Sequence, residues 1–136
     1  MTAPVRIVPA RVLDAGAVGA VMAEANAALP WLPPVFSGAQ DVKHAGDMIE
    51  AGWVKVARQQ DEIVGFIARA GQEIHGLYLH PLAQGQGIAR HLLDTSKAVC
   101  NQLNLWTYQA NARAMEFYRA AGFVEVARGD GSEPVA

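Results

Sequence analysis

The spacing of apolar residues changes along the chain and predicts helices in some segments and strands in others. The opening segment VRIVPA, residues 5–10, predicts a short edge strand that Pro9 ends. Apolar residues three or four positions apart then predict a helix over residues 12–29. Prolines at positions 30, 33 and 34 break this pattern, and a second, shorter helix is predicted over residues 41–51.

The middle of the chain has the pattern of a β-sheet. Three apolar runs, at residues 54–56, 63–68 and 74–79, have the length of strands and are separated by polar turns. The run IVGFI at residues 63–67 is apolar on both faces, which predicts a central strand that is covered on both sides.

The last third of the chain alternates helices and strands. A helix is predicted over residues 87–101, with Ile88, Leu92, Leu93, Val99 and Cys100 along one side, so that Cys100 is expected in the core. A strand over residues 103–109, a helix over residues 112–121 and a strand over residues 123–128 follow. The order β-α-α-β-β-β-α-β-α-β predicts a single α/β (α+β) three-layer domain over residues 1–136.

Composition and charge narrow the range of functions. Apolar residues make up 51% of the chain and charged residues 18%, which is typical of a globular domain. No apolar run has the length of a membrane span, and the first residues lack the pattern of a signal peptide. The single cysteine excludes an internal disulfide and favours a cytoplasmic location. With a net charge of −2 and no Lys/Arg cluster, we expect neither a nucleic-acid nor a membrane partner.

The stretch Gln84-Gly85-Gln86-Gly87-Ile88-Ala89 joins a predicted strand to a predicted helix. Gly85 and Gly87 permit a positive φ, so successive N–H groups can point into one concavity beside the positive end of the helix dipole. Such a place suits a phosphate or diphosphate, and Arg90 could add a charged contact. The alternative is that the two glycines only make a tight turn. The spacing matches neither a P-loop nor a dinucleotide fingerprint.

The same stretch, read as LYLHPLAQGQGIARHLL, resembles the acetyl-coenzyme A-binding motif of the GNAT superfamily of N-acetyltransferases, Gln/Arg-x-x-Gly-x-Gly/Ala. Gln84, Gly87 and Ala89 match its positions. The resemblance implies a GNAT-like, mostly antiparallel sheet and a diphosphate of acetyl-coenzyme A bound to the main chain from Gly85 to Arg90.

The segment NARAMEFYRAAGF resembles a second signature of the superfamily, which it matches at Asn111, Tyr118, Gly122 and Phe123. Tyr118 is at the position of the general acid that protonates the departing thiolate. The alternative is a tyrosine that only packs inside the helix. Asn111 would contact the pantetheine and also cap its helix, or would serve as a cap alone.

The resemblance also implies how the donor binds and reacts. The pantetheine would run along Leu77-Tyr78-Leu79 like an added strand, because this strand separates from its neighbour at a bulge. A free N–H, of Tyr78 or Leu79, would polarise the thioester carbonyl, and the acceptor amine would attack directly. The residues implied to bind acetyl-coenzyme A are Leu77, Tyr78, Leu79, Gln84, Gly85, Gln86, Gly87, Ile88, Ala89, Arg90, Asn111 and Tyr118.

Three routes remain for the proton of the attacking amine. Glu73 lies eleven residues before Gln84, an offset that matches the carboxylate base of some protein-acetylating members. His75, two residues later, is expected on the same face of the strand. The third route is through water, with Glu73 an exposed turn residue. The histidines and the cysteine have no metal-ligand spacing, so no metal is expected.

The acceptor and the end of the chain are less determined. The segment PWLPPVFSG, residues 30–38, is expected to form one wall of the acceptor site, for a small-molecule or peptide amine. Superfamily members usually end in two strands, and here residues 129–136 are too polar for the second. Either the sequence stops before that strand or a partner subunit of a homodimer supplies it. Two other functions stay open: a non-catalytic acyl-coenzyme A-binding module and an unrelated phosphate-binding protein.

Overall fold

The computed structural model describes residues 4–28, 38–107 and 110–126. The helices and strands within these residues are, in chain order, β1 (Val5–Pro9), the 3₁₀ helix η1 (Val12–Asp14), α1 (Ala15–Ala27), α2 (Gly38–Glu50), β2 (Val54–Gln59), β3 (Glu62–Ala70), β4 (Glu73–Leu79), the 3₁₀ helix η2 (Pro81–Ala83), α3 (Ile88–Lys97), β5 (Asn104–Leu105) and α4 (Ala112–Ala120).

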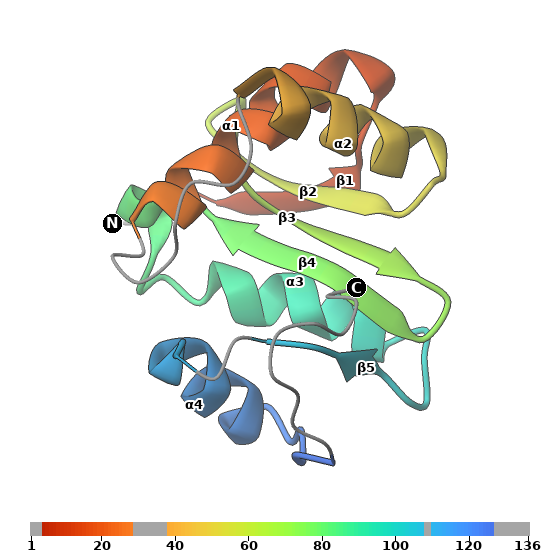
Figure 1. Cartoon of the computed structure of the whole chain (residues 1–136), viewed down its shortest axis with the longest axis vertical. Helices are drawn as coiled ribbons and strands as arrows, with labels where there is room; N and C mark the ends of the chain where they lie inside the picture. The colour runs from red at the N-terminus through yellow and green to blue at the C-terminus, as the bar shows by residue number, and fades with distance from the viewer. Residues whose placement is uncertain (1–3, 29–37, 108–109, 127–136) are drawn as a thin grey trace.

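The strands form one mixed sheet in the order β1-β2-β3-β4-β5 (Figure 1). Strands β1 to β4 are antiparallel to one another. Short turns connect β2 to β3 and β3 to β4, as is usual for antiparallel pairs. Strand β5 is parallel to β4, and α3 makes the crossover between them. The strand expected in the middle, β3, is indeed the central one, so the mostly antiparallel sheet with helices on both faces is confirmed.

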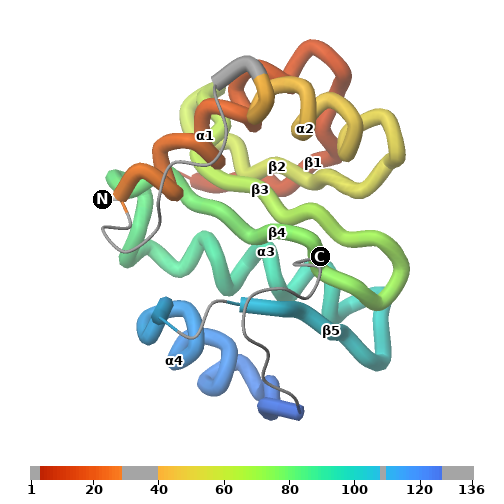
Figure 2. The backbone as a smooth tube through the Cα atoms, in the orientation of Figure 1, coloured from red at the N-terminus to blue at the C-terminus, as the bar shows by residue number. Residues whose placement is uncertain are grey.

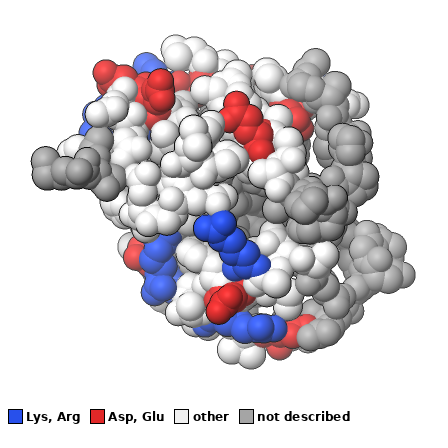
Figure 3. Space-filling model, turned by 90° about the vertical axis from the view of Figure 1, so that its left-hand side faces the viewer, with Lys and Arg blue, Asp and Glu red and all other residues white. Residues whose placement is uncertain are grey.

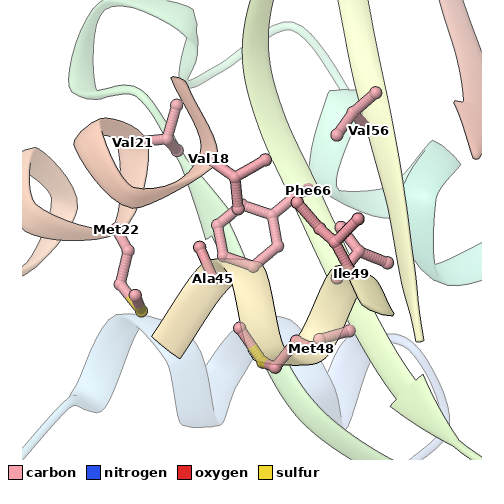
Figure 4. Packing of buried hydrophobic residues seen from close by; sticks show 10 residues of the cluster. Val18, Val21, Met22, Ala45, Met48, Ile49, Val56 and Phe66 are labelled. Carbon is pink, nitrogen blue, oxygen red and sulfur yellow. The ribbon is translucent and has the colours of Figure 1, made fainter. Parts of the chain in front are cut away.

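Each face of the sheet has its own hydrophobic cluster. Helices α1 and α2 cover one face, and Phe66 of β3 is fully buried beneath them with Val18 and Ile49 (Figure 4). Helix α3 covers the other face through Leu92 and Leu93, both fully buried, and α4 adds side chains to that cluster. Truncation of a buried phenylalanine such as Phe66 costs about 3–5 kcal/mol, so these clusters hold the layers together.

The start of α1 is fixed to the sheet by a buried carboxylate. Asp14 is 4% exposed, and its Oδ1 lies 2.8 Å from Nη2 of Arg58 on β2. Its Oδ2 accepts the N–H of Arg11 at 2.8 Å. Burial alone would raise the pKa of Asp14, but the hydrogen bonds and charges of Arg11 and Arg58 lower it below its usual value. The carboxylate therefore stays ionised and holds α1 against β2.

Several helix boundaries differ from the sequence prediction, and at two of them apolar residues expected in a helix are exposed or lie outside it. Helix α1 begins at Ala15, and Leu13 lies in the preceding 3₁₀ turn with 74% of its surface exposed. Helix α3 ends at Lys97, so Val99 is exposed and Cys100 lies beyond the helix. The expectation of a core cysteine is wrong, because the Cys100 thiol sits 3.2 Å from Nη1 of Arg69 in a half-buried turn.

The strand expected over residues 123–128 is not found in its described part. Residues 123–126 follow the end of α4 without regular structure, and residues 127–128 lie outside the described ranges. Val124 and Val126 are 81% and 93% exposed, so the apolar alternation here is not buried against the sheet. The pattern FVEVAR suggested a strand because its alternation has period two, but within the described residues no strand pairs with it.

Candidate active site

Strand β4 pairs with β5 only over its first two residues. Glu73 lies opposite Asn104 and Ile74 opposite Leu105, and no further pair follows in the described residues. The chain that follows β5 then diverges from β4 (Figure 2). The edge of β4 that faces β5 is therefore left open from its middle to its end.

A cavity of about 600 Å³ opens along this edge. It runs from the last turn of α1 along β4 to the loop before α3, and α4 forms the opposite wall. The described residues that line it are Ala25, Asn26, Ala28, Ile74, His75, Gly76, Leu77, Tyr78, Leu79, Pro81, Gln84, Gly85, Gly87, Ile88, Ala89, Arg90, Leu105, Trp106, Thr107, Asn111, Arg113, Ala114, Phe117 and Tyr118.

A β-bulge interrupts β4 where the two strands begin to separate. Ala68 of β3 lies opposite Gly76, whereas the next residue, Arg69, lies opposite Ile74. His75 is the extra residue and has no partner on β3. The bulge expected from the family resemblance is therefore present in this strand, and it bends the strand away from β5.

The bulge also reverses which residues face which helices. Ile74 and Leu77, three positions apart, both pack against the cluster under α3. Tyr78 packs on the opposite side, against the cluster under α1 and α2, and the His75 ring stacks on Trp53 on that side at 4.5 Å. Regular alternation would have put Ile74 and Tyr78 on one face. His75, the extra residue, lines the cavity, and its ring stacks on Trp53.

The register of β4 decides which of its amides face the cavity. The N–H of His80 donates to the carbonyl of Val64 at 2.8 Å, so this pair is hydrogen-bonded across to β3. Hydrogen-bonded and non-bonded pairs alternate in an antiparallel ladder, so Tyr78 is bonded to β3 as well. Leu77 and Leu79 direct their amides away from β3, toward the open edge. The register therefore leaves the N–H groups of Leu77 and Leu79, and not that of Tyr78, on the open side of β4.

Two glycines make room for this arrangement. A Cβ at Gly76 would lie 2.8 Å from Cε2 of Tyr78, whose ring folds back over the bulge. A Cβ at Gly65 would lie 2.9 Å from the Tyr78 carbonyl oxygen and closer still to the Leu79 side chain. Larger residues at either position would displace the strand that forms the cavity wall.

The loop before α3 has the conformation that the sequence predicted. Gly85 and Gly87 have φ angles of 82° and 78°, which glycine adopts without strain. Gly87 is the N-cap residue of α3, and no side chain caps its first amides. These amides and the helix dipole point toward the cavity end lined by Gln84 and Ile88. The loop therefore offers main-chain donors to an anion.

Tyr118 lies on α4 across the cavity from β4. Burial raises its pKa to about 12, with a smaller contribution from the neighbouring Tyr78. Its ring contacts Phe117 and Phe123 edge-on, at centroid distances of 5.3 and 5.5 Å. Asn111 lines the same cavity, and its side chain accepts the N–H of Ala114 at 3.1 Å, so it caps α4. Because its pKa is raised in this way, the Tyr118 phenol stays protonated at every physiological pH.

The structure brings together most of the predicted site residues, with two exceptions. Glu73 begins β4 at its paired end, about 16 Å along the strand from Tyr78, and is absent from the described lining of the cavity. The Gln86 side chain turns toward β2, where its Oε1 accepts from Gln59 at 3.1 Å. Of the two candidate bases, His75 is the one that lines the cavity.

Several lining residues were not predicted from the sequence. Asn26 of α1, and Trp106 and Thr107 after β5, also line the cavity. These positions have no distinctive local pattern, because only the packing of α1 and the departure of β5 bring them together. Arg113, by contrast, lies within the second signature, two residues after Asn111, and this position could have indicated that it is near the site.

His80, which directly follows β4, connects the end of this strand to α1. His80 Nδ1 accepts the N–H of Leu82 at 3.1 Å, so the ring proton lies on Nε2. Nε2 is 2.7 Å from Oε2 of Glu24 on α1. This bond joins the turn before the glycine loop to α1.

Residues 4–28, 38–107 and 110–126 contain neither a helix that could span a membrane nor a cluster that could bind a metal ion. No described helix has the length and apolar character needed to cross a membrane. No group of three or more His, Cys, Asp or Glu side chains there is arranged to hold a metal ion. Residues 30–37, most of the segment expected to form the acceptor wall, lie outside the described ranges.

Comparison with known proteins identifies the family. The model of the acetyltransferase (GNAT) domain matches residues 36–132. Over 78 residues the chain is 32% identical to the peptidyl-lysine N-acetyltransferase YjaB of Salmonella typhimurium and 30% identical to its counterpart in Escherichia coli. Each match covers 57% of this chain and 53% or 52% of the relative, so the chain spans about half the length of these relatives.

Solved structures share the fold across nearly the whole chain. The solution structure of apo YjaB from Escherichia coli has a TM-score of 0.79 at 20% identity, covering 97% of this chain and 92% of that one. The aminoglycoside N-acetyltransferase AAC(6')-Iy in complex with coenzyme A has a TM-score of 0.77 at 13% identity, covering 98% and 97%. PaiA of Thermoplasma acidophilum, also with coenzyme A, has a TM-score of 0.74 at 18% identity, covering 95% and 94%.

Proposed function

Because the chain belongs to the GNAT family of acetyltransferases, we propose that it transfers an acetyl group from acetyl-coenzyme A directly to a primary amine. The observation that carries this proposal is the open edge of β4. Leu77 and Leu79 direct their amides to this edge, in a cavity that the glycine loop before α3 and Tyr118 of α4 also line. A phosphate site, an extended main-chain edge and a proton donor in one cavity are what a coenzyme A thioester needs for acyl transfer.

The donor would lie along β4 as an additional strand. Its diphosphate would rest on the main-chain amides at Gly85 to Arg90, and its pantetheine would pair with the open edge of β4. One of the two edge amides, of Leu77 or Leu79, would donate to the thioester carbonyl oxygen. A preorganised donor of this kind stabilises the developing oxyanion by roughly 3–4 kcal/mol.

Tyr118 would assist the departure of the thiolate. A thiol has a pKa near 8.5, well below the value of about 12 for Tyr118. Complete transfer of the phenol proton to the thiolate is therefore unfavourable, and the phenol acts best as a hydrogen-bond donor to the sulfur. This refines the role of general acid, because it explains why a tyrosine with a raised pKa is useful: it never loses its donor proton under working conditions.

His75 is the better-placed base for the acceptor amine. It lines the cavity at the bulge, and its ring is held in orientation by the stack on Trp53. An imidazole can accept a proton near neutral pH, where an alkyl amine is still mostly protonated. Glu73 remains a second candidate, because a water molecule could relay a proton between its carboxylate and the cavity.

The acceptor end of the cavity supports an alkyl amine on a mostly uncharged chain. Asn26, Trp106 and Thr107 line the cavity, and the described lining contains no acidic residue that would select a polycation. The relatives at 30% and 32% identity are named peptidyl-lysine N-acetyltransferases. We therefore propose a peptidyl lysine as the first acceptor to be tested.

The decisive experiment follows thiol release from acetyl-coenzyme A with purified protein and a panel of amines. The panel should include lysine-containing peptides, peptides with a free N-terminus as the only amine, and small polyamines. We expect turnover with at least one primary amine and none with the matched acetylated amine. If coenzyme A binds but no amine is acetylated, the chain is a binding module. If coenzyme A does not bind, the proposed function is wrong altogether.

A further inference from the structure

Arg113 lies at the mouth of the cavity and contacts the glycine loop. It is the second residue of α4, and its Nη1 donates to Oε1 of Gln84 at 2.6 Å. The two residues are 29 positions apart in sequence, and both line the cavity. This bond joins the wall formed by α4 to the loop that carries the free amides.

The charges at this mouth are unequal. Arg90, the other arginine of the lining, is paired with Asp94 one turn later on α3, at 3.3 Å. Within the part of the chain that the structure describes, no carboxylate forms an ion pair with Arg113. Lys and Arg side chains lie on the lower half of the face that shows the loop and the start of α4, with Asp and Glu side chains between them (Figure 3). Arg113 is thus the less neutralised cation beside the loop.

The loop itself supplies only neutral donors. The family motif allows either arginine or glutamine at position 84, and this chain has the uncharged glutamine. A diphosphate is a charged ligand, and hydrogen bonds from a cation to its oxygens are stronger than those from neutral amides. Gln84 accepts one of the five N–H donors of the Arg113 guanidinium, so the others remain for a ligand.

We propose that Arg113 is a diphosphate-binding residue, held in place by Gln84, which supplies from α4 the positive charge that position 84 lacks. This inference rests on the proposed binding of acetyl-coenzyme A. The guanidinium would approach the diphosphate from the side opposite the main-chain amides of the loop. Its planar fork suits two phosphate oxygens at once.

The test is a comparison of three ligands by calorimetry or, for weak binding, by NMR titration. The ligands are coenzyme A, 3′-dephospho-coenzyme A and pantetheine, and the proteins are the wild type, Arg113→Gln and Arg119→Gln. Arg119 is an exposed arginine near the other end of the same helix and outside the cavity lining, so it is the matched control. Thermal unfolding establishes that each variant is folded.

We expect Arg113→Gln to weaken coenzyme A and 3′-dephospho-coenzyme A alike, by about 10- to 100-fold, because both carry the diphosphate. Pantetheine, which has no diphosphate, should bind both proteins equally, and Arg119→Gln should bind all three ligands as the wild type does. The affinity of Arg113→Gln for coenzyme A should also depend less on salt. Arg113→Lys should lose less affinity than Arg113→Gln, since it keeps the charge but not the fork.

Three results would overturn the inference. A loss for coenzyme A without a loss for its dephospho form would place Arg113 at the 3′-phosphate. An equal loss for pantetheine would make its role structural, and unchanged affinities would remove it from the site. In each case the wild type still binds coenzyme A. Absence of wild-type binding would instead contradict the proposed function.

Discussion

The two ends of the cavity are built from different parts of the chain. The donor end consists mainly of main chain: the amides of Leu77 and Leu79, and the loop at Gly85 and Gly87 with its free helix start. The rest of the described lining comes from three separate segments, which include Asn26 of α1, His75 of β4 and Trp106 after β5.

This difference explains what each end can conserve and what it can change. Main-chain donors are present whatever the side chains are, provided that glycine and the strand register keep them exposed. A wall made of side chains changes with every substitution. We therefore expect the donor end to recognise a fixed ligand, and the other end to set the identity of the acceptor.

The largest effect on turnover is expected from Tyr118→Phe, which removes the donor to the sulfur while the ring remains. We expect kcat to fall by about 10²–10⁴-fold, with the affinity for coenzyme A nearly unchanged. Stopped-flow or steady-state thiol release measures the first quantity and calorimetry the second. Unaltered turnover would leave Tyr118 with a packing role only.

A pH titration of stability checks the same residue without any substrate. The pKa of Tyr118 is raised from 10.0 to about 12 in the folded protein, because burial disfavours the phenolate. The free energy of unfolding should therefore fall as the pH rises from about 10 to about 12, since only the unfolded chain ionises there. Tyr118→Phe should remove this part of the pH dependence.

The next largest effect concerns the donor end. Gly87→Asp places a carboxylate at a residue with a φ of 78° and beside the free amides of the loop. Strain and like-charge repulsion should weaken coenzyme A binding by about 100-fold or more. In the activity that remains, the preference among amines should stay the same. Gly52→Asp is a matched control, because Gly52 also has a φ of 78° but lies outside the cavity lining. Native affinity in Gly87→Asp would place the diphosphate elsewhere.

A smaller effect is expected at the bulge. His75→Ala should lower kcat/KM about 10-fold near neutral pH and less at high pH, where the acceptor amine is already deprotonated. Glu73→Gln should leave the pH–rate profile as it is, because Glu73 is not among the described residues that line the cavity. The reverse result would identify Glu73 as the base, and two unchanged profiles would favour release of the proton to water.

The smallest effect on transfer is expected from Asp14→Asn, which acts far from the donor end. The unfolding free energy should fall by about 1–3 kcal/mol, because a buried charged hydrogen bond to Arg58 is weakened. Coenzyme A affinity should change less than about 2-fold. The stabilisation by Asp14 should be present above about pH 4 in the wild type and be lost as the pH falls below the lowered pKa, which acid unfolding measures.

Much of the fold was predictable because its periodicities are long and consistent. The IVGFI run correctly indicated the central strand, since only a strand covered on both faces is apolar throughout. The end of α3 and the fate of residues 123–126 were not predictable, because Val99, Cys100 and Val124 continue an apolar pattern that tertiary packing does not use. Periodicity indicates a face, but only a partner surface decides whether that face is buried.

The sequence by itself determined the conformation of the glycine loop before α3, because the positive φ angles at Gly85 and Gly87 and the uncapped start of α3 are local properties of glycine and of helix ends. Only the tertiary structure decided which amides of β4 are free, that His75 rather than Glu73 lines the cavity, and that Arg113 meets Gln84. These three features depend on strand register, a one-residue bulge and a contact between distant segments. None of them is encoded within a single stretch of the chain.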